Sequence, residues 1–273
     1  MQIRKLCFIG AGNMPRSIIS GLVKNGYEAS SIIASNPSTP KLEALEADFS
    51  INVTQSNEDA ANAADVIVLS VKPQLMEAMC AELIKTVTLG DKLVVSIAAG
   101  ITTARLTEML GGHKNIVRTM PNTPSALGLG MTGLFATADV SQLDQEFSTL
   151  VMSQIGKTLW VKHENDINTV IAAAGSSPAY FFLFAQAMQD EAIAMGIEKD
   201  DARLLVQQAM IGSAEMIANN PSLELSELRA QVTSKGGTTF AAIECFQQHK
   251  LEEIVSKSMQ AAVARANNMA KEF

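Results

Sequence analysis

The sequence has 273 residues, of which 47% are hydrophobic and 18% charged, a composition typical of a compact protein rather than a disordered or fibrous one. Acidic residues outnumber basic ones by 28 to 21, and the formal charge of -7 argues against a basic surface for nucleic acid or anionic membranes. The three cysteines and three histidines are scattered without metal-ligand spacing, so no metal site is expected and a reducing compartment is indicated.

Residues 1–161 alternate short β-branched runs with helical segments, which is typical of parallel βαβ units. Strands are expected at residues 6–10, 31–35, 66–70, 93–98 and 115–118, with edge strands at 131–136 and 158–161. The central runs VIVLSV and LVVSIA are almost wholly apolar, as strands covered by helices on both faces should be. The sequence therefore predicts an α/β domain with a doubly wound, mainly parallel sheet.

Residues 162–273 lack an alternating strand pattern, and their apolar residues recur at three and four spacing. This second part is predicted to be all-helical, with proline and glycine residues separating the helices. The alanine- and methionine-rich segments 171–195 and 255–269 are apolar over more than one narrow stripe. Internal packing and burial against a second copy of the chain both account for that pattern.

The first predicted strand runs into the turn Gly10-Ala11-Gly12-Asn13-Met14-Pro15, ahead of a helical stretch. A strand, a glycine turn and a helix start allow backbone N–H groups and the helix dipole to face a pyrophosphate. This placement favours dinucleotide binding over a merely tight turn. Pro15 stands where a small residue is expected, and it is tolerable there because the first helical turn needs no N–H from it.

The second predicted strand ends in Ala34-Ser35-Asn36-Pro37-Ser38, without the carboxylate that usually binds the ribose hydroxyls of NAD. Donors on Ser35, Asn36, Ser38 and Lys41 are available to a 2′-phosphate, so NADPH is favoured over NADH. A polar turn with a helix cap at Ser38 is the alternative reading.

Two later strand ends should meet the rest of the cofactor, because open sheets bind ligands beyond the carboxyl ends of their strands. One end is Val71-Lys72-Pro73-Gln74, with a cation and a rigid turn, although a strand-end lysine is often merely solvated. The other is Ser96-Ile97-Ala98-Ala99-Gly100, whose small residues let a flat ring approach.

No hydrolase, kinase or metalloprotease motif is present in the sequence. Few side chains are required if a nicotinamide supplies the reactive hydride. The best second site is residues 232–239, VTSKGGTT, whose hydroxyls, glycines and helix start suit a carboxylate. A helix cap on Thr238 or Thr239 explains the same residues equally well.

These pieces, in this order, resemble the pyrroline-5-carboxylate reductase family. The matching segments span nearly the whole chain: FIGAGNM (8–14), VKPQ (71–74), SIAAGIT (96–102), RTMPNTPSALGLG (118–130), GSSPAY (175–180) and VTSKGGTTFAAIECFQ (232–247). The resemblance implies a Rossmann-type, doubly wound, mainly parallel sheet at 1–161, followed by an all-α C-terminal dimerisation and substrate-binding domain at 162–273. It also implies a homodimer through the C-terminal helices, or a larger homo-oligomer.

The resemblance assigns roles to residues of three groups. Those of the first group bind NADP(H), or alternatively NAD(H): Ile9, Gly10, Gly12, Asn13, Met14, Ser35, Asn36, Asn57, Val71, Lys72, Pro73, Ala98 and Ala99. Those of the second hold the substrate: Gly236, Gly237, Thr238 and, less securely aligned, Glu164. Those of the third are catalytic: Thr239, which contacts the imine nitrogen, and Ser234. Departures from the family pattern occur at Pro15, Ser177 and Lys235.

The expected activity is NADPH-dependent hydride transfer to the C=N bond of 1-pyrroline-5-carboxylate, giving L-proline. A reductase of another small cyclic imine or of a β-hydroxyacid, or a non-catalytic NADP-binding sensor, are the alternatives. The short apolar run behind the basic N-terminus predicts no signal peptide, and the other long apolar runs, at 66–71 and 93–99, fall short of a membrane span. A cytoplasmic location is expected.

Overall fold

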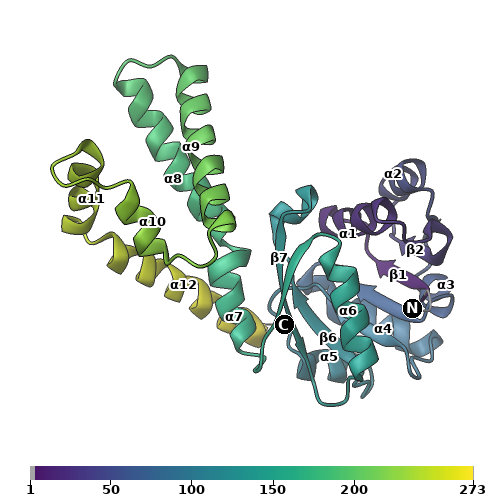
Figure 1. Ribbon diagram of the computed structural model, residues 1–273. Coiled ribbons are helices and arrows are strands. Elements are labelled where there is room, and N and C mark those ends of the chain that lie inside the picture. The colour runs from purple at the N-terminus through teal and green to yellow at the C-terminus, as the bar shows by residue number, and fades with distance from the viewer. Residues whose placement is uncertain (1–3, 273) are drawn as a thin grey trace. The chain divides into compact units, whose positions relative to one another are not determined.

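A computed structural model describes residues 4–272 of the chain, and within them eight strands form one sheet in the order β3-β2-β1-β4-β5-β6-β7-β8 (Figure 1). Neighbouring strands are parallel except β6 and β7, which are antiparallel. The strands are β1 (Leu6–Ile9), β2 (Ile32–Ser35), β3 (Asn52–Thr54), β4 (Val66–Leu69), β5 (Leu93–Ser96), β6 (Ile116–Met120), β7 (Gly130–Ala136) and β8 (Gly156–Trp160). The predicted mainly parallel sheet is confirmed.

Helices cover both faces of this sheet, as its apolar strands require. They are α1 (Asn13–Lys24), α2 (Thr39–Phe49), α3 (Asn57–Asn62), α4 (Pro73–Thr86), α5 (Thr103–Met109) and α6 (Gln142–Ser153), with the short 3-10 turns η1 (Ala29–Ser31) and η2 (Thr123–Leu127). One core contains buried residues of α1, α2 and α6, and the other contains those of α3, α4 and α5. The sheet is therefore the middle layer of three.

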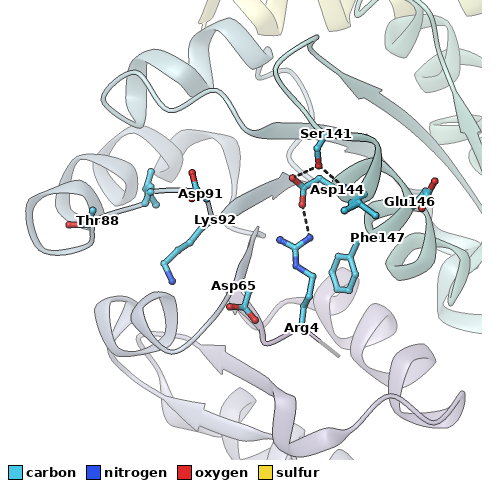
Figure 2. Close-up of a pocket in the computed structure, with 12 residues that line it drawn as sticks. Arg4, Asp65, Thr88, Asp91, Lys92, Ser141, Asp144, Glu146 and Phe147 are labelled. Carbon is cyan, nitrogen blue, oxygen red and sulfur yellow. Dashed lines mark hydrogen bonds and ion pairs between the residues drawn. The ribbon is translucent and has the colours of Figure 1, made fainter. Parts of the chain in front are cut away.

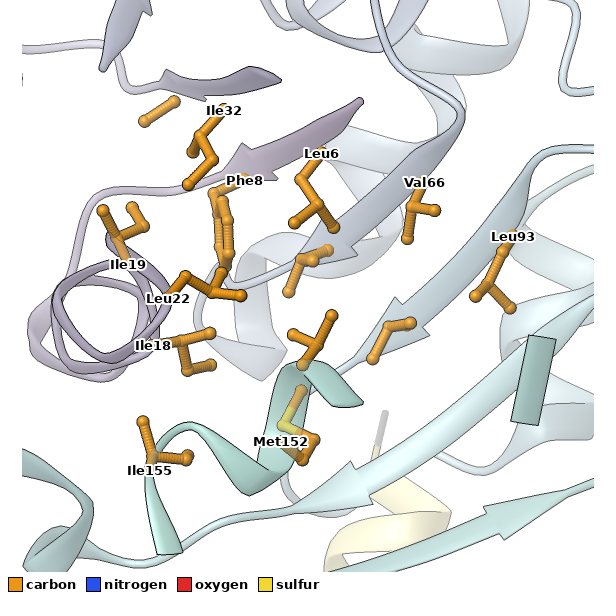
Figure 3. Packing of buried hydrophobic residues seen from close by; sticks show 14 of the residues in the cluster. Leu6, Phe8, Ile18, Ile19, Leu22, Ile32, Val66, Leu93, Met152 and Ile155 are labelled. Carbon is orange, nitrogen blue, oxygen red and sulfur yellow. The ribbon is translucent and has the colours of Figure 1, made fainter. Parts of the chain in front are cut away.

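The alternation of side chains along β1 divides the two cores. Leu6 and Phe8 point to the first core, where they lie among residues of α1 and α6 (Figure 3), while Cys7 and Ile9 point to the second. Burial raises the pKa of the Cys7 thiol to about 12, so this cysteine is a core residue and no nucleophile.

The strand β3 was absent from the sequence prediction. It is a short edge strand of Asn52, Val53 and Thr54, none of them fully buried, so it carries no apolar run by which sequence reasoning could find it. Its pairing with β2 supplies the tertiary hydrogen bonds that local sequence does not encode.

The chain forms two compact units, the described parts of Met1–Ser176 with Ala261–Phe273, and Ser177–Gln260. The second unit contains α8 (Ser177–Ala194), α9 (Lys199–Asn219), α10 (Leu225–Gln231), α11 (Thr238–Gln248) and the start of α12 (Leu251–Glu272). Its helices confirm the predicted all-α character of the C-terminal part. The division into residues 1–161 and 162–273 is based on the change from strands to helices, and it stays a prediction.

Two helical segments that follow β8 belong to the first unit, namely α7 (Asp166–Val170) and the π-helix η3 (Ile171–Gly175). The end of α12 belongs there too, and the Asn168 side chain donates to Asn267 Oδ1 over 2.8 Å. The first unit thus includes helical segments, because its boundary follows contacts with the sheet and its covering helices and not the type of secondary structure.

The apolar segment 171–195, which lies in the part predicted to be helical, begins with the π-helix η3 and continues as α8. Proline has no N–H, so Pro178 cannot donate to the Ala174 carbonyl as an α-helix requires. That carbonyl accepts instead from the Asn122 side chain over 3.0 Å, and the Ser176 N–H donates to the Ile171 carbonyl over 2.7 Å. The wide turn begins the GSSPAY segment.

Gly21 of α1 provides a test of the packing between α1 and α6. A Cβ at Gly21 would lie 2.4 Å from the backbone carbonyl oxygen of Gln154. Helix propensity alone favours Gly21→Ala by about 1 kcal/mol, but the clash is expected to outweigh this gain and lower the free energy of unfolding by about 2 kcal/mol. Urea titration measures the change, with Ser20→Ala as the matched control. A Gly21→Ala protein as stable as the unsubstituted one would contradict the packing.

Candidate functional site

The turn after β1 allows no side chain at Gly10. Its φ is +109°, and a Cβ there would lie 2.7 Å from the Ser70 carbonyl oxygen, at the end of β4. The Gly10 N–H donates to the Ser35 carbonyl, at the end of β2, over 2.8 Å. The turn is thereby fixed at the carboxyl ends of β1, β2 and β4, at the edge where ligands of open α/β sheets bind.

The start of α1 is open to an anion. Gly12 is its N-cap and, among the described residues, no side-chain hydrogen bond caps the helix. The first backbone N–H groups are therefore available to a ligand, together with the positive end of the dipole. Asn13 is exposed at this end, and Pro15 is buried in the first turn, where its missing N–H costs nothing. These residues fit a pyrophosphate.

Two adjacent residues at the end of β2, Ser35 and Asn36, differ in burial. Ser35 is fully buried and its hydroxyl donates to Asn57 Oδ1 over 2.7 Å, so these two predicted cofactor residues bind each other. Asn36 lies at the rim, where its side chain accepts from the Ala11 N–H over 3.4 Å and donates to Ser38 Oγ over 2.9 Å. Asn36 and Ser38, not the Ser35 hydroxyl, form the polar turn that a 2′-phosphate could reach.

The ends of β4 and β5 lie along the same edge of the sheet as the glycine turn. Lys72 is exposed as the N-cap of α4, with Pro73 as the first helical residue. After β5, Ala98 is buried and Ala99 half-buried, and Gly100 has a φ of +79°. The structure thus brings the predicted pyrophosphate and nicotinamide residues of the first unit to one edge.

Glu164 has partners that sequence reasoning missed. Its Oε1 accepts from the Thr103 N–H over 2.7 Å and from Arg118 over 3.0 Å, and its Oε2 accepts from the Thr103 hydroxyl over 2.8 Å. The Arg118 side chain is only 4% exposed. A charged residue inside the apolar strand 116–120 was the available signal, because a buried cation requires an ionic partner. The prediction that Glu164 binds substrate stays untested.

The turn before α11 belongs to the second unit. Gly237 is the N-cap of α11 without a side-chain hydrogen bond to cap the helix in the described chain, so neither Thr238 nor Thr239 acts as the cap. Gly236 has a φ of +76°, and the Gly237 N–H donates to the Ser234 carbonyl over 2.9 Å. The two threonines are exposed. Like α1, α11 begins with uncapped backbone N–H groups that suit an anion.

A cavity of about 790 Å³ lies at the opposite, amino edge of the sheet, beside Arg4, Lys92 and Asp144 (Figure 2). Arg4 and Asp144 form an ion pair at this cavity. Arg4 donates to Asp144 over 2.6 Å, and although burial opposes ionisation, hydrogen bonds from Arg4, Asn115 and Ser141 hold the Asp144 pKa below its usual value. The cavity therefore adds a structural ion pair to the first unit.

Comparison with known families matches both parts of the chain. Residues 164–269 match the family model for pyrroline-5-carboxylate reductase dimerisation, and residues 5–100 match the model for NADP oxidoreductase, coenzyme F420-dependent. The helical part and the nucleotide-binding part thus match separate models, in the order found in this chain.

Full-length relatives agree. The chain is 56% identical over 273 residues to a pyrroline-5-carboxylate reductase of Vibrio alginolyticus, covering 100% of both chains. It resembles a solved pyrroline-5-carboxylate reductase of Coxiella burnetii, with 38% identity, a TM-score of 0.93 and coverage of 98% and 99% of the two chains. It also resembles the Plasmodium falciparum pyrroline carboxylate reductase solved with NADP bound, with 26% identity, a TM-score of 0.87 and 99% coverage of both.

Proposed function

The chain belongs to the pyrroline-5-carboxylate reductase family, and we propose that it carries out the family's reaction with the help of the two helix starts at Gly12 and Gly237. The protein is an NAD(P)H-dependent oxidoreductase that reduces 1-pyrroline-5-carboxylate to L-proline, a step of proline biosynthesis. The single observation that supports this use of the two helix starts is that α1 and α11 both have a glycine as N-cap residue. In the described residues no side-chain hydrogen bond caps either helix. Each offers backbone N–H groups to an anion.

The α1 site is assigned to the cofactor NADP(H). The turn at Gly10, which has no room for a Cβ, and the uncapped start of α1 suit the pyrophosphate. Asn36 and the neighbouring Ser38 are assigned to the 2′-phosphate, since no carboxylate stands there to repel it. Ala98 and Ala99 are assigned to the nicotinamide face, because small residues allow a ring to approach.

The α11 site is assigned to the substrate. The backbone N–H groups of Gly237 and Thr238 would hold the substrate carboxylate, and the Thr239 hydroxyl would orient the imine nitrogen and its proton. When bound, the nicotinamide supplies a hydride to the carbon of the C=N bond. The protonated nitrogen then becomes the secondary amine of proline, so no strong acid or base is required of the chain. Ser234 and Gly236 shape this turn.

The protein forms a homo-oligomer, and we assign the contact to the C-terminal helices of two interlocked copies. The α8 helix contains no buried residue, and Phe181, Phe182 and Leu183 are 60, 67 and 70% exposed. Such an apolar surface requires cover. The stretch Asp166–Ala194 is also long and apolar enough to cross a membrane by composition. We assign its apolar character instead to the dimer contact, and we propose a cytoplasmic location.

Asn36→Asp tests the assignment of the 2′-phosphate. A carboxylate at this position would repel the phosphate and accept from the ribose hydroxyls, so NADPH is expected to bind at least tenfold more weakly while NADH binds equally well or better. Dissociation constants from the fluorescence of the two cofactors measure the effect. Asn36→Ala separates loss of the amide from the added charge. An equal loss of affinity for both cofactors would show that Asn36 does not face the 2′-phosphate.

Thr239→Ala tests the role of the hydroxyl in the reaction. Loss of the group that orients the imine nitrogen is expected to lower kcat by about 100-fold with little change in the KM for the imine. Thr239→Ser retains the hydroxyl and should keep most of the activity. The measurement is the loss of NADPH absorbance with pyrroline-5-carboxylate, and unchanged kinetics of Thr239→Ala would remove this residue from the mechanism.

A further inference from the structure

The turn between β5 and α5 is fixed at its near end by Ser96. The Ser96 hydroxyl accepts from the Ala98 N–H over 3.3 Å, and the Ser96 carbonyl accepts from the Thr119 hydroxyl over 3.0 Å. Ser96 is also paired with Arg118 in the sheet. The start of the turn is therefore held by the paired strands β5 and β6.

The far end of the turn is held by Glu164. Thr103, the first residue of α5, gives both its N–H and its hydroxyl to the two oxygens of this carboxylate, over 2.7 and 2.8 Å. Arg118 holds the same carboxylate over 3.0 Å. A carboxylate at a helix start is further stabilised by the dipole of the helix. Between these two fixed ends lie Ala98 and Ala99.

We infer that Glu164 is a positioning residue, whose carboxylate fixes the far end of the 97–102 turn and so sets where Ala98 and Ala99 meet the nicotinamide. The inference rests on the proposed function, which assigns those alanines to the nicotinamide. It differs from the expectation that Glu164 touches the substrate, because both of its oxygens already accept hydrogen bonds from Thr103 and Arg118. The Glu164 side chain is only 21% exposed.

Two variants loosen the turn in different ways. Thr103→Val removes one hydrogen bond to Glu164 and keeps the shape of the side chain, while Thr103→Ser is the matched control that keeps the hydroxyl. Glu164→Gln removes the charge and keeps an acceptor for Thr103. Because Thr103 has no proposed contact with substrate, a loss of NADPH affinity shared by Thr103→Val and Glu164→Gln supports an effect through the turn.

The readout is the affinity for two nucleotides, measured without turnover. NADPH carries the nicotinamide, whereas adenosine 2′,5′-bisphosphate carries only the adenosine end of the cofactor. We expect NADPH to bind about tenfold more weakly to Glu164→Gln and about fivefold more weakly to Thr103→Val, with the bisphosphate bound as in the unsubstituted protein. Thr103→Ser should bind both nucleotides normally, and the KM for the imine should change by less than about twofold in all variants.

Three results would overturn the inference. A Glu164→Gln protein with a KM for the imine raised tenfold and an unchanged NADPH affinity would place Glu164 on the substrate. A lower melting temperature of Thr103→Val and Glu164→Gln, with no loss of NADPH affinity, would make the contact merely structural. An unsubstituted protein that binds neither nucleotide would overturn the proposed function itself, and this outcome is distinct from the other two.

Discussion

Uncapped backbone N–H groups at the starts of α1 and α11 are the constraint on which the account of this protein depends. A helix normally satisfies its first N–H groups with a side chain from the N-cap residue. Gly12 and Gly237 have no side chain to give, and in the described chain none from elsewhere caps these helices. Each helix start thus offers free backbone N–H groups that suit a negatively charged group. In a reductase, two such groups must be held, the phosphates of the cofactor and the carboxylate of the substrate.

The sheet positions the first of these helix starts by packing alone. Gly10 is pressed against the Ser70 carbonyl, so the turn at the end of β1 admits only glycine. Buried apolar residues of α1 and β1 then pack against each other in the first core (Figure 3). The cation of Arg118 is buried in the same unit and forms an ion pair with Glu164, which links the 97–102 turn to the segment ahead of α7. In the first unit, the same buried contacts that stabilise the fold therefore also position the candidate site.

Periodicity and turn chemistry predicted most of this fold from the sequence. Apolar runs revealed the inner strands, and glycines revealed both helix starts, because each signal is local. The features that the sequence did not predict are contacts between residues far apart in the chain. Ser35 faces Asn57 inside the protein because of its register in β2, and the partner of Arg118 lies 46 residues away. The wide turn η3 depends on the Asn122 side chain reaching the Ala174 carbonyl. None of these contacts has a signature within a short window.

The most direct test of the two helix starts compares two substrates that differ only in the carboxylate. Reduction of 1-pyrroline-5-carboxylate and of 1-pyrroline by NADPH is followed at fixed cofactor concentration. If α11 holds the carboxylate, two lost hydrogen bonds to a charged group should lower kcat/KM for 1-pyrroline by about 100-fold or more. Equal kcat/KM values for the two rings, or no oxidation of NADPH with either, would contradict the account.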